Sequence, residues 1–174
     1  KACEVLGCGT LDPGTAQLSF GTAAAINCTL PRYVEVERLL PAYPAALPGA
    51  FNAELHVPRG FWLVSWFKRE FGGDESQFDA LLAATPPGAM GLAALPYWSP
   101  GLRDPGPEAK GAVIGFGDVH TRAHLYRALI EGIVMQLRAG RERIEHRTGR
   151  RLTRLVVARG GSQSDGAMQI AADV

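Results

Sequence analysis

The sequence is poor in cysteine and in net charge. Its 174 residues hold three cysteines, Cys3, Cys8 and Cys28, an odd and sparse set that argues against a disulfide framework. The formal net charge is +1, so no global field attracts nucleic acid or anionic lipid. We therefore expect reduced thiols in a cytoplasmic protein, with neither nucleic acid nor a membrane among its partners.

Long apolar runs are missing as well. The longest charge-free run, residues 81–102, is long enough to span a bilayer but holds four prolines, which would leave backbone groups unpaired in lipid. No basic stretch followed by an apolar run opens the chain, so we expect no secretory signal. Because the chain opens on Lys1 and its end still reads as helix, we expect it to be a piece of a longer protein.

Catalytic constellations are also absent from the sequence. It holds no visible Ser-His-Asp or Cys-His arrangement, and no residue stands out as a general base. His120 and His124 have an i,i+4 spacing that zinc can use, but no Glu follows in HExxH form. We interpret both histidines as capping or solvated side chains, and predict no metal ligand and no catalytic residue in this chain.

The last third of the chain has the clearest pattern. Two apolar segments, residues 111–116 and 152–158, are predicted to be buried strands. Between them, residues 121–149 form a long amphipathic helix that Gly149 closes. A Gly-Gly turn at 160–161 precedes a further helix from Asp165. Alternating strands and helices favour an α/β fold with a partly parallel sheet.

The earlier part is predicted from shorter patterns. Residues 16–20 and 23–30 read as two strands, joined by the two-residue connection Gly21-Thr22. Residues 41–58, with four prolines, read as irregular. Helices are expected at 60–71 and at 76–84, the second with Ser76 as its N-cap, and a proline-rich loop at 86–107.

Two glycine turns are candidates for phosphate or nucleotide binding. Ser19-Phe20-Gly21-Thr22 places a glycine and a hydroxyl at a hairpin, where backbone amides can face phosphate oxygens. Gly160-Gly161 lies between a strand and a helix, whose first amides suit a nucleotide. On spacing alone, we favour a plain hairpin for the first segment and an ordinary strand–helix turn, with Ser162 or Ser164 as helix cap, for the second.

Arginines cluster along the long helix and beyond it. A nucleic-acid patch would show such a run, but Glu142 and Glu145 interleave with it. We interpret the run as the solvated face of an amphipathic helix. It comprises Arg138, Arg141, Arg143, Arg147, Arg150, Arg151 and Arg154.

Several segments, taken in order, resemble the FGGY family of carbohydrate kinases. GAVIGFGDVHTRAHLYRALIEG, residues 111–132, is similar to the family's C-terminal signature, with Phe116 and Leu129 as mild departures. LSFGT at 18–22 looks like its phosphate-binding hairpin, and the helix with Trp66 looks like the one lining its adenosine site. The remaining matches are LPYWS at 95–99, where residues 100–103 depart from the usual tail, and the Gly160-Gly161 segment with Gln169, Ala172 and Asp173, where Arg159 replaces the first glycine.

The resemblance covers nearly the whole chain and implies a fold. Family members have an actin-like ATPase fold of two ribonuclease-H-like domains, with ATP in the cleft between them. Residues 15–174 would be the C-terminal ATP-binding domain, an α/β unit with a mixed sheet and flanking helices, incomplete at its C-terminal end. Residues 1–14 would be the tail of the N-terminal sugar-binding domain or the crossover between domains.

The resemblance also implies a site. Gly21 and Thr22 would contact the β- or γ-phosphate, and Gly160 and Gly161 would pack on adenine and ribose. The family's catalytic base is an Asp shortly before an LGxG segment, which residues 6–9 (LGCG) match, so the base would lie directly before Lys1, outside this chain. The implied ATP-binding residues are Gly21, Thr22, Gly60, Ser65, Gly160, Gly161, Ser164 and Asp165.

The function implied is that of a xylulose-kinase-like enzyme using ATP and Mg²⁺. It would phosphorylate a hydroxyl of a ketopentose or a related sugar or polyol, with the N-terminal domain of the same protein as partner. A non-catalytic nucleotide- or sugar-sensing module on the same fold is the alternative. The fragment alone is predicted to be inactive, and an exposed sheet edge would allow it to pair as a homodimer.

Overall fold

A computed structural model describes residues 1–99 and 106–174. The α-helices are α1 (Ala2–Gly7), α2 (Trp62–Phe71), α3 (Phe78–Ala83), α4 (Arg122–Thr148) and α5 (Asp165–Asp173). Three short 3-10 helices are η1 (Glu75–Gln77), η2 (Pro87–Gly91) and η3 (Gly160–Gln163). The strands are β1 (Thr15–Phe20), β2 (Ala24–Leu30), β3 (Tyr43–Pro44), β4 (Phe51–Val57), β5 (Ala93–Leu95), β6 (Ala112–Ile114) and β7 (Arg154–Ala158).

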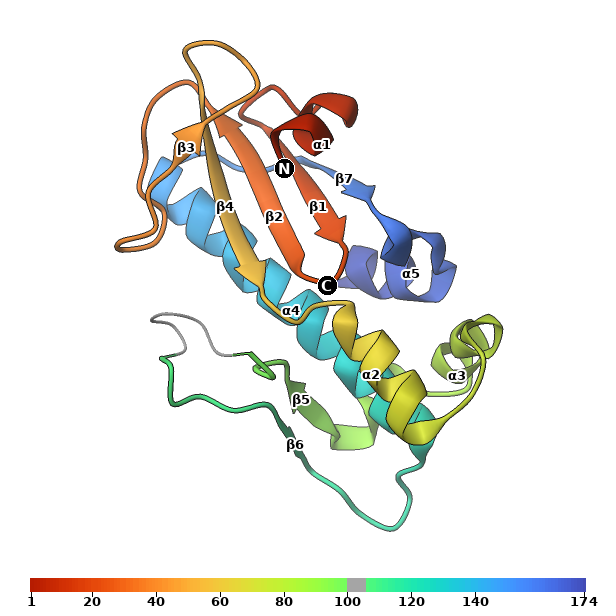
Figure 1. Cartoon of the computed structure of the whole chain (residues 1–174). Coiled ribbons are helices and arrows are strands. Elements are labelled where there is room, and N and C mark those ends of the chain that lie inside the picture. Colours follow the sequence, from red (N-terminus) through yellow and green to blue (C-terminus); the bar gives the residue numbers. More distant parts are fainter. Residues whose placement is uncertain (100–105) are drawn as a thin grey trace.

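A mixed five-stranded sheet forms one half of the molecule (Figure 1). Its order is β3-β4-β2-β1-β7, in which β1, β2, β4 and β3 pair antiparallel and β7 joins β1 in parallel. The parallel pairing sets Ser19 opposite Ala158, so the β1–β2 turn and the β7–α5 turn meet at one end of the sheet. That end carries the candidate site.

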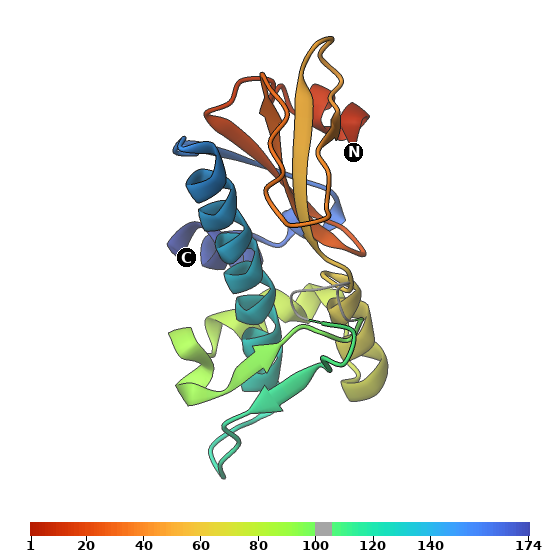
Figure 2. The ribbon, with the colours of Figure 1, turned by 90° about the vertical axis from the view of Figure 1, so that its left-hand side faces the viewer.

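The two faces of the sheet differ in chemistry. Because side chains alternate along a strand, Leu18 of β1 and Ile26 of β2 share the face that α4 and α5 cover. Gln17 and Asn27 lie on the opposite face, where α1 packs, and Asn27 donates to Gln17 at 2.8 Å. Figure 2 shows the sheet between α4 on one side and α1 on the other. One face thus makes the apolar core and the other a buried polar layer.

Helix α4 is the longest helix of the described residues. It runs from the five-stranded sheet to the part of the molecule drawn below it, the lower half (Figure 2). Thr121 and His124 form a capping box at its start, and Gly149, in the left-handed conformation with φ 67°, ends it. The predicted helix at 121–149 is confirmed. Gly140 lets it approach β2, because a Cβ there would lie 3.1 Å from Ile26 Cγ2.

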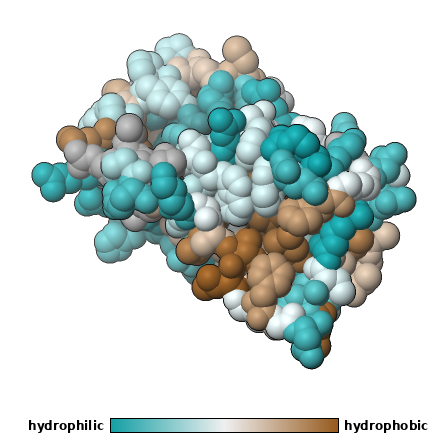
Figure 3. All heavy atoms as spheres, turned by 60° about the horizontal axis from the view of Figure 1, so that its bottom comes forward, coloured by the Kyte–Doolittle hydropathy of each residue, from teal (hydrophilic) through white to brown (hydrophobic). Residues whose placement is uncertain are grey.

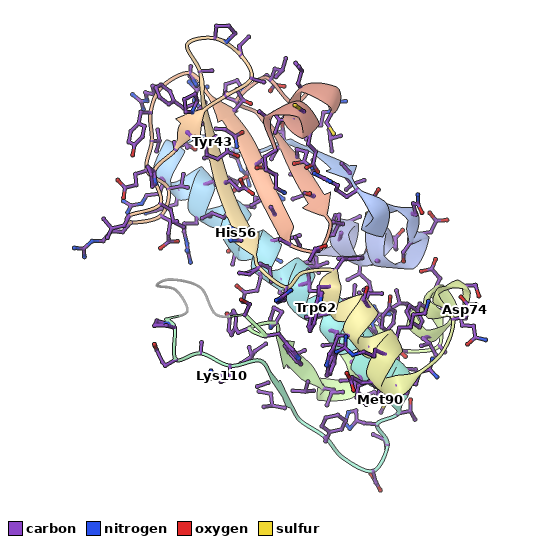
Figure 4. The ribbon with its side chains drawn as sticks, viewed as in Figure 1. Tyr43, His56, Trp62, Asp74, Met90 and Lys110 are labelled. Carbon is purple, nitrogen blue, oxygen red and sulfur yellow. The ribbon has the colours of Figure 1, made fainter. Side chains whose placement is uncertain are left out.

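The lower half packs short elements against the other end of α4. α2, α3, η2 and the two-stranded β5–β6 sheet surround it, and Figure 4 locates Asp74 and Met90 there. Apolar surface gathers on this lower face (Figure 3), where the exposed side chains include Met90, Ile114 and Phe116. No helix in the described ranges is apolar and long enough to cross a membrane.

Residues 41–58 correct one prediction. They are not irregular: they hold β3 and the seven-residue β4, which lies inside the sheet between β2 and β3. Their four prolines stand outside β4, so the seven residues from Phe51 to Val57 keep their backbone amides for the sheet. Tyr43 and His56 mark β3 and β4 in Figure 4.

Three further local predictions were wrong in detail. The β1–β2 connection has three residues, since Phe20 pairs with Ala24 and the amide of Gly21 donates to Ala23 at 3.2 Å. Ser76 does not cap α3: it lies in η1, and its amide donates to Asp74 Oδ1 at 3.2 Å. The predicted buried strands β6 and β7 are partly exposed, because each is an edge strand of its sheet in the described part of the chain.

Candidate functional site

A cavity of about 540 Å³ opens where the β1–β2 turn, α2, α3 and the β7–α5 turn converge. Trp62, labelled in Figure 4, stands at the junction between the two halves of the molecule. The lining residues are Phe20, Gly21, Thr22, Phe61, Trp62, Val64, Ser65, Ser76, Phe78, Asp79, Tyr126, Gly160, Gly161, Gln163 and Ser164.

Six of the eight residues proposed from the sequence line this cavity. They are Gly21, Thr22, Ser65, Gly160, Gly161 and Ser164. Gly60 and Asp165 do not. Gly60 has a packing role instead, since a Cβ there would lie 2.2 Å from the backbone nitrogen of Ala24. Asp165 lies one residue beyond the cap, as the first residue of α5.

The β1–β2 turn is held in place by the start of α2. The amide of Phe61 donates to the carbonyl of Gly21 at 3.0 Å, and the amide of Trp62 donates to the carbonyl of Thr22 at 3.2 Å. These bonds use amides that a helix start leaves unpaired. The turn's carbonyls are therefore occupied on the side of α2, while the Thr22 side chain remains exposed at the cavity.

The β7–α5 turn approaches the opposite wall closely. A Cβ on Gly161 would lie 2.4 Å from the Phe61 ring and 2.8 Å from the carbonyl oxygen of Phe20. Only glycine fits there without displacing an aromatic wall of the cavity. Ser164 caps α5 by accepting from the amide of Ala167 at 3.1 Å.

Several lining residues had not been singled out from the sequence. Asp79 of α3 is one: the Ser164 hydroxyl donates to its carboxylate, which ties α3 to α5. Phe61 and Trp62 lie in the segment already matched to an adenosine-lining helix, so their position was a usable signal. Phe78 and Tyr126 reach the cavity from α3 and α4, and no local pattern marks them.

Aromatic rings and polar side chains together line the cavity. Phe61 contacts Phe20 edge to face, with 5.2 Å between ring centroids, and the Arg59 guanidinium lies 4.8 Å from the Trp62 ring. Planar rings, hydroxyls and one carboxylate suit a flat heterocycle bearing a sugar, and glycine amides suit phosphate. The arrangement has the chemistry of a nucleotide site.

Trp66 itself lies away from this cavity. It packs edge to face on Trp98, with 5.0 Å between ring centroids, and both partly buried rings pack against the hydrophobic core. Helix α2 lines the cavity through Trp62 and Ser65 instead. Residues 100–103, which depart from the usual tail of the motif matched at 95–99, lie outside the described residues.

The two histidines have structural contacts. His124 Nδ1 accepts from the amide of Thr121 at 3.1 Å, and His120 Nδ1 accepts from the amide of Gly117 at 2.7 Å. Over the described residues, no three His, Cys, Asp or Glu side chains come together as a metal site. These bonds fit the interpretation of the two histidines as capping or solvated side chains: His124 belongs to the capping box of α4, and His120 bonds within the exposed turn before it.

The arginine run makes ion pairs along and beyond α4. Arg138 lies 2.9 Å from Glu142, and Arg141 lies 3.1 Å from Glu145. Arg143 pairs with Glu37 of the loop between β2 and β3. These pairs fit the interpretation of the run as the charged face of a helix.

Residues 16–174 match the model of the FGGY family of carbohydrate kinases, C-terminal domain. The chain belongs to this family. Its α/β fold with a mixed sheet is therefore that of the FGGY C-terminal domain, as the sequence motifs had indicated.

Relatives and solved structures agree with this assignment. A xylulose kinase of Lactococcus lactis is 30% identical over 180 residues, covering 100% of this chain and 35% of that protein. A glycerol kinase of Mycobacterium tuberculosis is 35% identical over 121 residues, covering 64% of this chain and 22% of that protein. The crystal structure of xylulose kinase from Rhodospirillum rubrum superposes with a TM-score of 0.87 at 28% identity, covering 99% of this chain and 35% of that one.

The FGGY chain described here spans about a third of the length of the xylulose kinases that it matches. Those relatives therefore contain a large part with no counterpart in these residues. The FGGY kinases use ATP as phosphate donor, and the nucleotide-like cavity lies inside the matched domain.

Proposed function

We propose that this chain is the ATP-binding part of a sugar kinase that transfers the γ-phosphate of ATP to a hydroxyl of a ketopentose such as xylulose, or of a related sugar or polyol. One observation carries the proposal. The hairpin turn, the Gly160-Gly161 turn and the aromatic wall of α2, far apart in sequence, enclose a single cavity inside an FGGY domain.

The residues present fit a nucleotide. The cavity volume of about 540 Å³ lies within the range of small-molecule sites. Gly161 packs so closely on Phe61 that a Cβ there would displace the Phe61 ring, and Phe61 and Trp62 offer flat apolar surfaces to the cavity. Ser65, Ser164 and Asp79 add polar groups at the rim, which suit ribose hydroxyls or base nitrogens.

Each residue then has a distinct task. Gly21 and Thr22 would face the phosphates, with the Thr22 hydroxyl as a donor to charge that develops during transfer. Gly160 and Gly161 would lie on the adenine and ribose. When bound, Mg-ATP supplies the transferable phosphoryl group and the cation that neutralises part of its charge.

The proposal assigns the remaining machinery to the rest of the protein. The general base would be an Asp directly before Lys1, and the N-terminal domain would hold the sugar. Among the described residues that line the cavity, the carboxylate is that of Asp79, and it accepts from the Ser164 hydroxyl, so none of these described residues stands out as a general base. The isolated chain would therefore bind nucleotide without transferring phosphate.

The choice of sugar rests on the relatives. In sequence, the relatives that match the whole chain include several xylulose kinases, whereas the glycerol kinase of Mycobacterium tuberculosis matches 64% of it. This favours a ketopentose over glycerol as the substrate class. Because the contacts that select the sugar would lie in the N-terminal domain, only an assay of the whole protein can identify it.

The test is ADP release by the full-length protein with Mg-ATP and a panel of ketopentoses, hexuloses and polyols. A strong response to one ketopentose supports the proposal and names the substrate. Silence across the panel, in a folded protein that still binds ATP, overturns the kinase assignment and favours a nucleotide- or sugar-sensing module. Sugar-dependent ADP release by residues 1–174 alone would refute the assignment of the base to the upstream segment.

A further inference from the structure

Arg159 holds an unusual backbone conformation beside the cavity. Its φ is 78° and its ψ is 176°, a region that L side chains rarely adopt and that glycine adopts without strain. Its carbonyl accepts from the amide of Ser162 at 3.1 Å and from the Ser162 hydroxyl at 2.7 Å. An arginine thus occupies the position where the family motif has its first glycine, and the surrounding turn keeps the backbone in the glycine conformation.

The Arg159 side chain reaches away from the cavity, toward α1. The aliphatic part of the Arg159 side chain packs beside the β1–β2 turn, since a Cβ on Gly21 would lie 3.8 Å from Arg159 Cγ. Its Nη2 lies 3.1 Å from Glu4 Oε2. The Arg159 side chain is 55% exposed and the Glu4 side chain 9%. Arg159 is not among the residues that line the cavity, so its charge lies beside the nucleotide site and not within it.

Glu4 is a fixed partner. Its Oε1 accepts from Gln17 Nε2 at 2.8 Å, and Gln17 Oε1 accepts in turn from Asn27 Nδ2 at 2.8 Å. Gln17 and Asn27 are fully buried on the polar face of the sheet. Lys1 Nζ lies 4.0 Å from Glu4 Oε2, on the same side as Arg159. The carboxylate is therefore held by the sheet and offers its second oxygen to the two cations.

Burial alone would raise the pKa of Glu4. The Arg159 guanidinium at 3.1 Å, the nearby Ser19 side chain and the charge of Lys1 outweigh burial and hold the pKa of Glu4 below its usual value. Glu4 is therefore ionised at neutral pH. The ion pair with Arg159 is present under the conditions in which a kinase works.

We propose that the Glu4–Arg159 ion pair is a positioning contact that ties α1 to the Gly160-Gly161 turn. This inference rests on the proposed function, in which the general base directly precedes Lys1 and the turn holds the nucleotide. Arg159 connects the proposed base and the Gly160-Gly161 turn. Its backbone precedes that turn, and its side chain forms an ion pair with Glu4 of α1, the helix that would follow the base. In this proposal, bound nucleotide restricts the motion of the Gly160-Gly161 turn, and the Glu4–Arg159 ion pair restricts the motion of α1 in turn.

A direct contact between Arg159 and phosphate is the competing explanation. In that case the Arg159 guanidinium would leave Glu4 when nucleotide binds. Replacing Arg159 would then weaken nucleotide binding whether or not Glu4 is present. In the positioning role, Glu4 and Arg159 act as one unit. Loss of either would reduce the rate of transfer while nucleotide binding stays nearly unchanged.

The first test is hydrogen exchange of the full-length protein with and without ADP. We expect ADP to slow exchange of the α1 amides in the wild type and in the control R138Q, which breaks an exposed pair with Glu142. In E4Q and R159Q, ADP should still bind with a Kd within about fivefold of wild type, the range of an exposed ion pair. The α1 response should be lost in both. An unchanged α1 response in both variants would overturn the proposal.

The second test is a double-mutant cycle on turnover at saturating substrates. E4Q and R159Q should each lower kcat by about 10- to 100-fold, as misplaced reacting groups do, and the double variant should be no worse than either. R159K, which keeps the charge, should recover part of kcat, whereas R159G, which relaxes the backbone, should not. Additive losses, or a large rise in the Kd of ADP in R159Q alone, would favour direct phosphate contact and overturn the positioning role.

The two tests separate this inference from the proposed function. Exchange and ADP binding need no sugar turnover, so the pair can be tested even if no substrate in the panel responds. Absence of ADP binding by the wild type would overturn both proposals together. Normal turnover in R159G would overturn only the role of the ion pair.

Discussion

The guanidinium of Arg127 donates to the carbonyl of Leu82, a residue 45 positions earlier in the chain, across 3.0 Å. A second bond from the same nitrogen reaches the carbonyl of Thr85 at 2.8 Å, and Arg127 Nε lies 2.7 Å from Glu131. Glu131 in turn accepts from the amide of Gly88 at 3.0 Å. One buried arginine on α4 thus fixes the end of α3 and, through Glu131, the start of η2.

Replacement of Arg127 should therefore be costly. Arg127→Met leaves the Glu131 carboxylate, 15% exposed, without its cation and removes the guanidinium donor from the carbonyls of Leu82 and Thr85. We expect a loss of about 3–5 kcal/mol in the free energy of unfolding. Urea unfolding measures it. Arg138→Met, which removes an exposed pair, should cost about 0–1 kcal/mol, and a similar small loss for Arg127→Met would contradict this role.

Gly160 and Gly161 offer a matched pair of substitutions. A Cβ on Gly161 would collide with the Phe61 ring at 2.4 Å, whereas a Cβ on Gly160 meets nothing within 4 Å. We expect Gly161→Ala to displace the aromatic wall, to cost about 1–3 kcal/mol of stability and to weaken ADP binding at least about tenfold. Gly160→Ala should change both little. Calorimetric titration with ADP, beside thermal unfolding, distinguishes the two variants, and equal behaviour would contradict the packing argument.

Thr22 should matter for transfer more than for binding. Its hydroxyl lies at the mouth of the cavity, so Thr22→Ala in the full-length enzyme removes a donor to charge that develops during phosphoryl transfer. The expected loss in kcat is about 100-fold, or about 3 kcal/mol, with little change in sugar binding. Thr22→Ser, which keeps the hydroxyl, is the control. An unchanged kcat in Thr22→Ala would remove Thr22 from the mechanism.

Stability should fall in acid, in part through Glu145. Burial would raise the pKa of this carboxyl, but the amide of Leu152, the guanidinium of Arg141 and the charges of Arg141 and Arg151 hold it below its ordinary value of 4.5. A depressed pKa contributes stability that is complete above the unfolded-state pKa and lost as the pH falls through the folded-state pKa. This loss of stability is measured by urea unfolding midpoints from about pH 7 to about pH 2.5, a range that spans the titration of a carboxyl group. The difference between wild type and Glu145→Gln should shrink steadily below pH 4.5; a constant difference would contradict this.

The cysteines should differ sharply in reactivity. Cys3 is exposed, whereas Cys28 is buried on the α4 face of β2. Burial, together with the nearby charge of Asp12, raises the pKa of Cys28 to about 12, so almost no thiolate exists at neutral pH. A maleimide should label Cys3 in the native protein and Cys28 only after unfolding. Rapid native labelling of Cys28, located by peptide mapping, would be the contrary result.

Local patterns in the sequence were sufficient to predict several helices, strands and turns of this molecule. The i,i+4 apolar spacing between residues 121 and 149, closed by Gly149, specified α4 because a helix start, stripe and stop are all local features. The hairpin β1–β2 and the Gly160-Gly161 turn were also predicted, although the β1–β2 connection has three residues and not two. The order of all the matched segments along the chain, of which 111–132 is the strongest, indicated the family. The strand β4 was missed because four nearby prolines masked a run that none of them interrupts.

The cavity itself was decided by tertiary structure. Asp79, Phe78 and Tyr126 line it because α3 and α4 are brought to the end of β1, and no spacing between them in the sequence reports that proximity. Gly60 shows the converse: its place in a matched segment suggested a ligand contact, but the close approach to Ala24 explains it. Periodicity and turn chemistry act over a few residues and can be read from the chain, whereas the contacts that build the site, such as Glu4 with Arg159, join residues that only the folded sheet brings together.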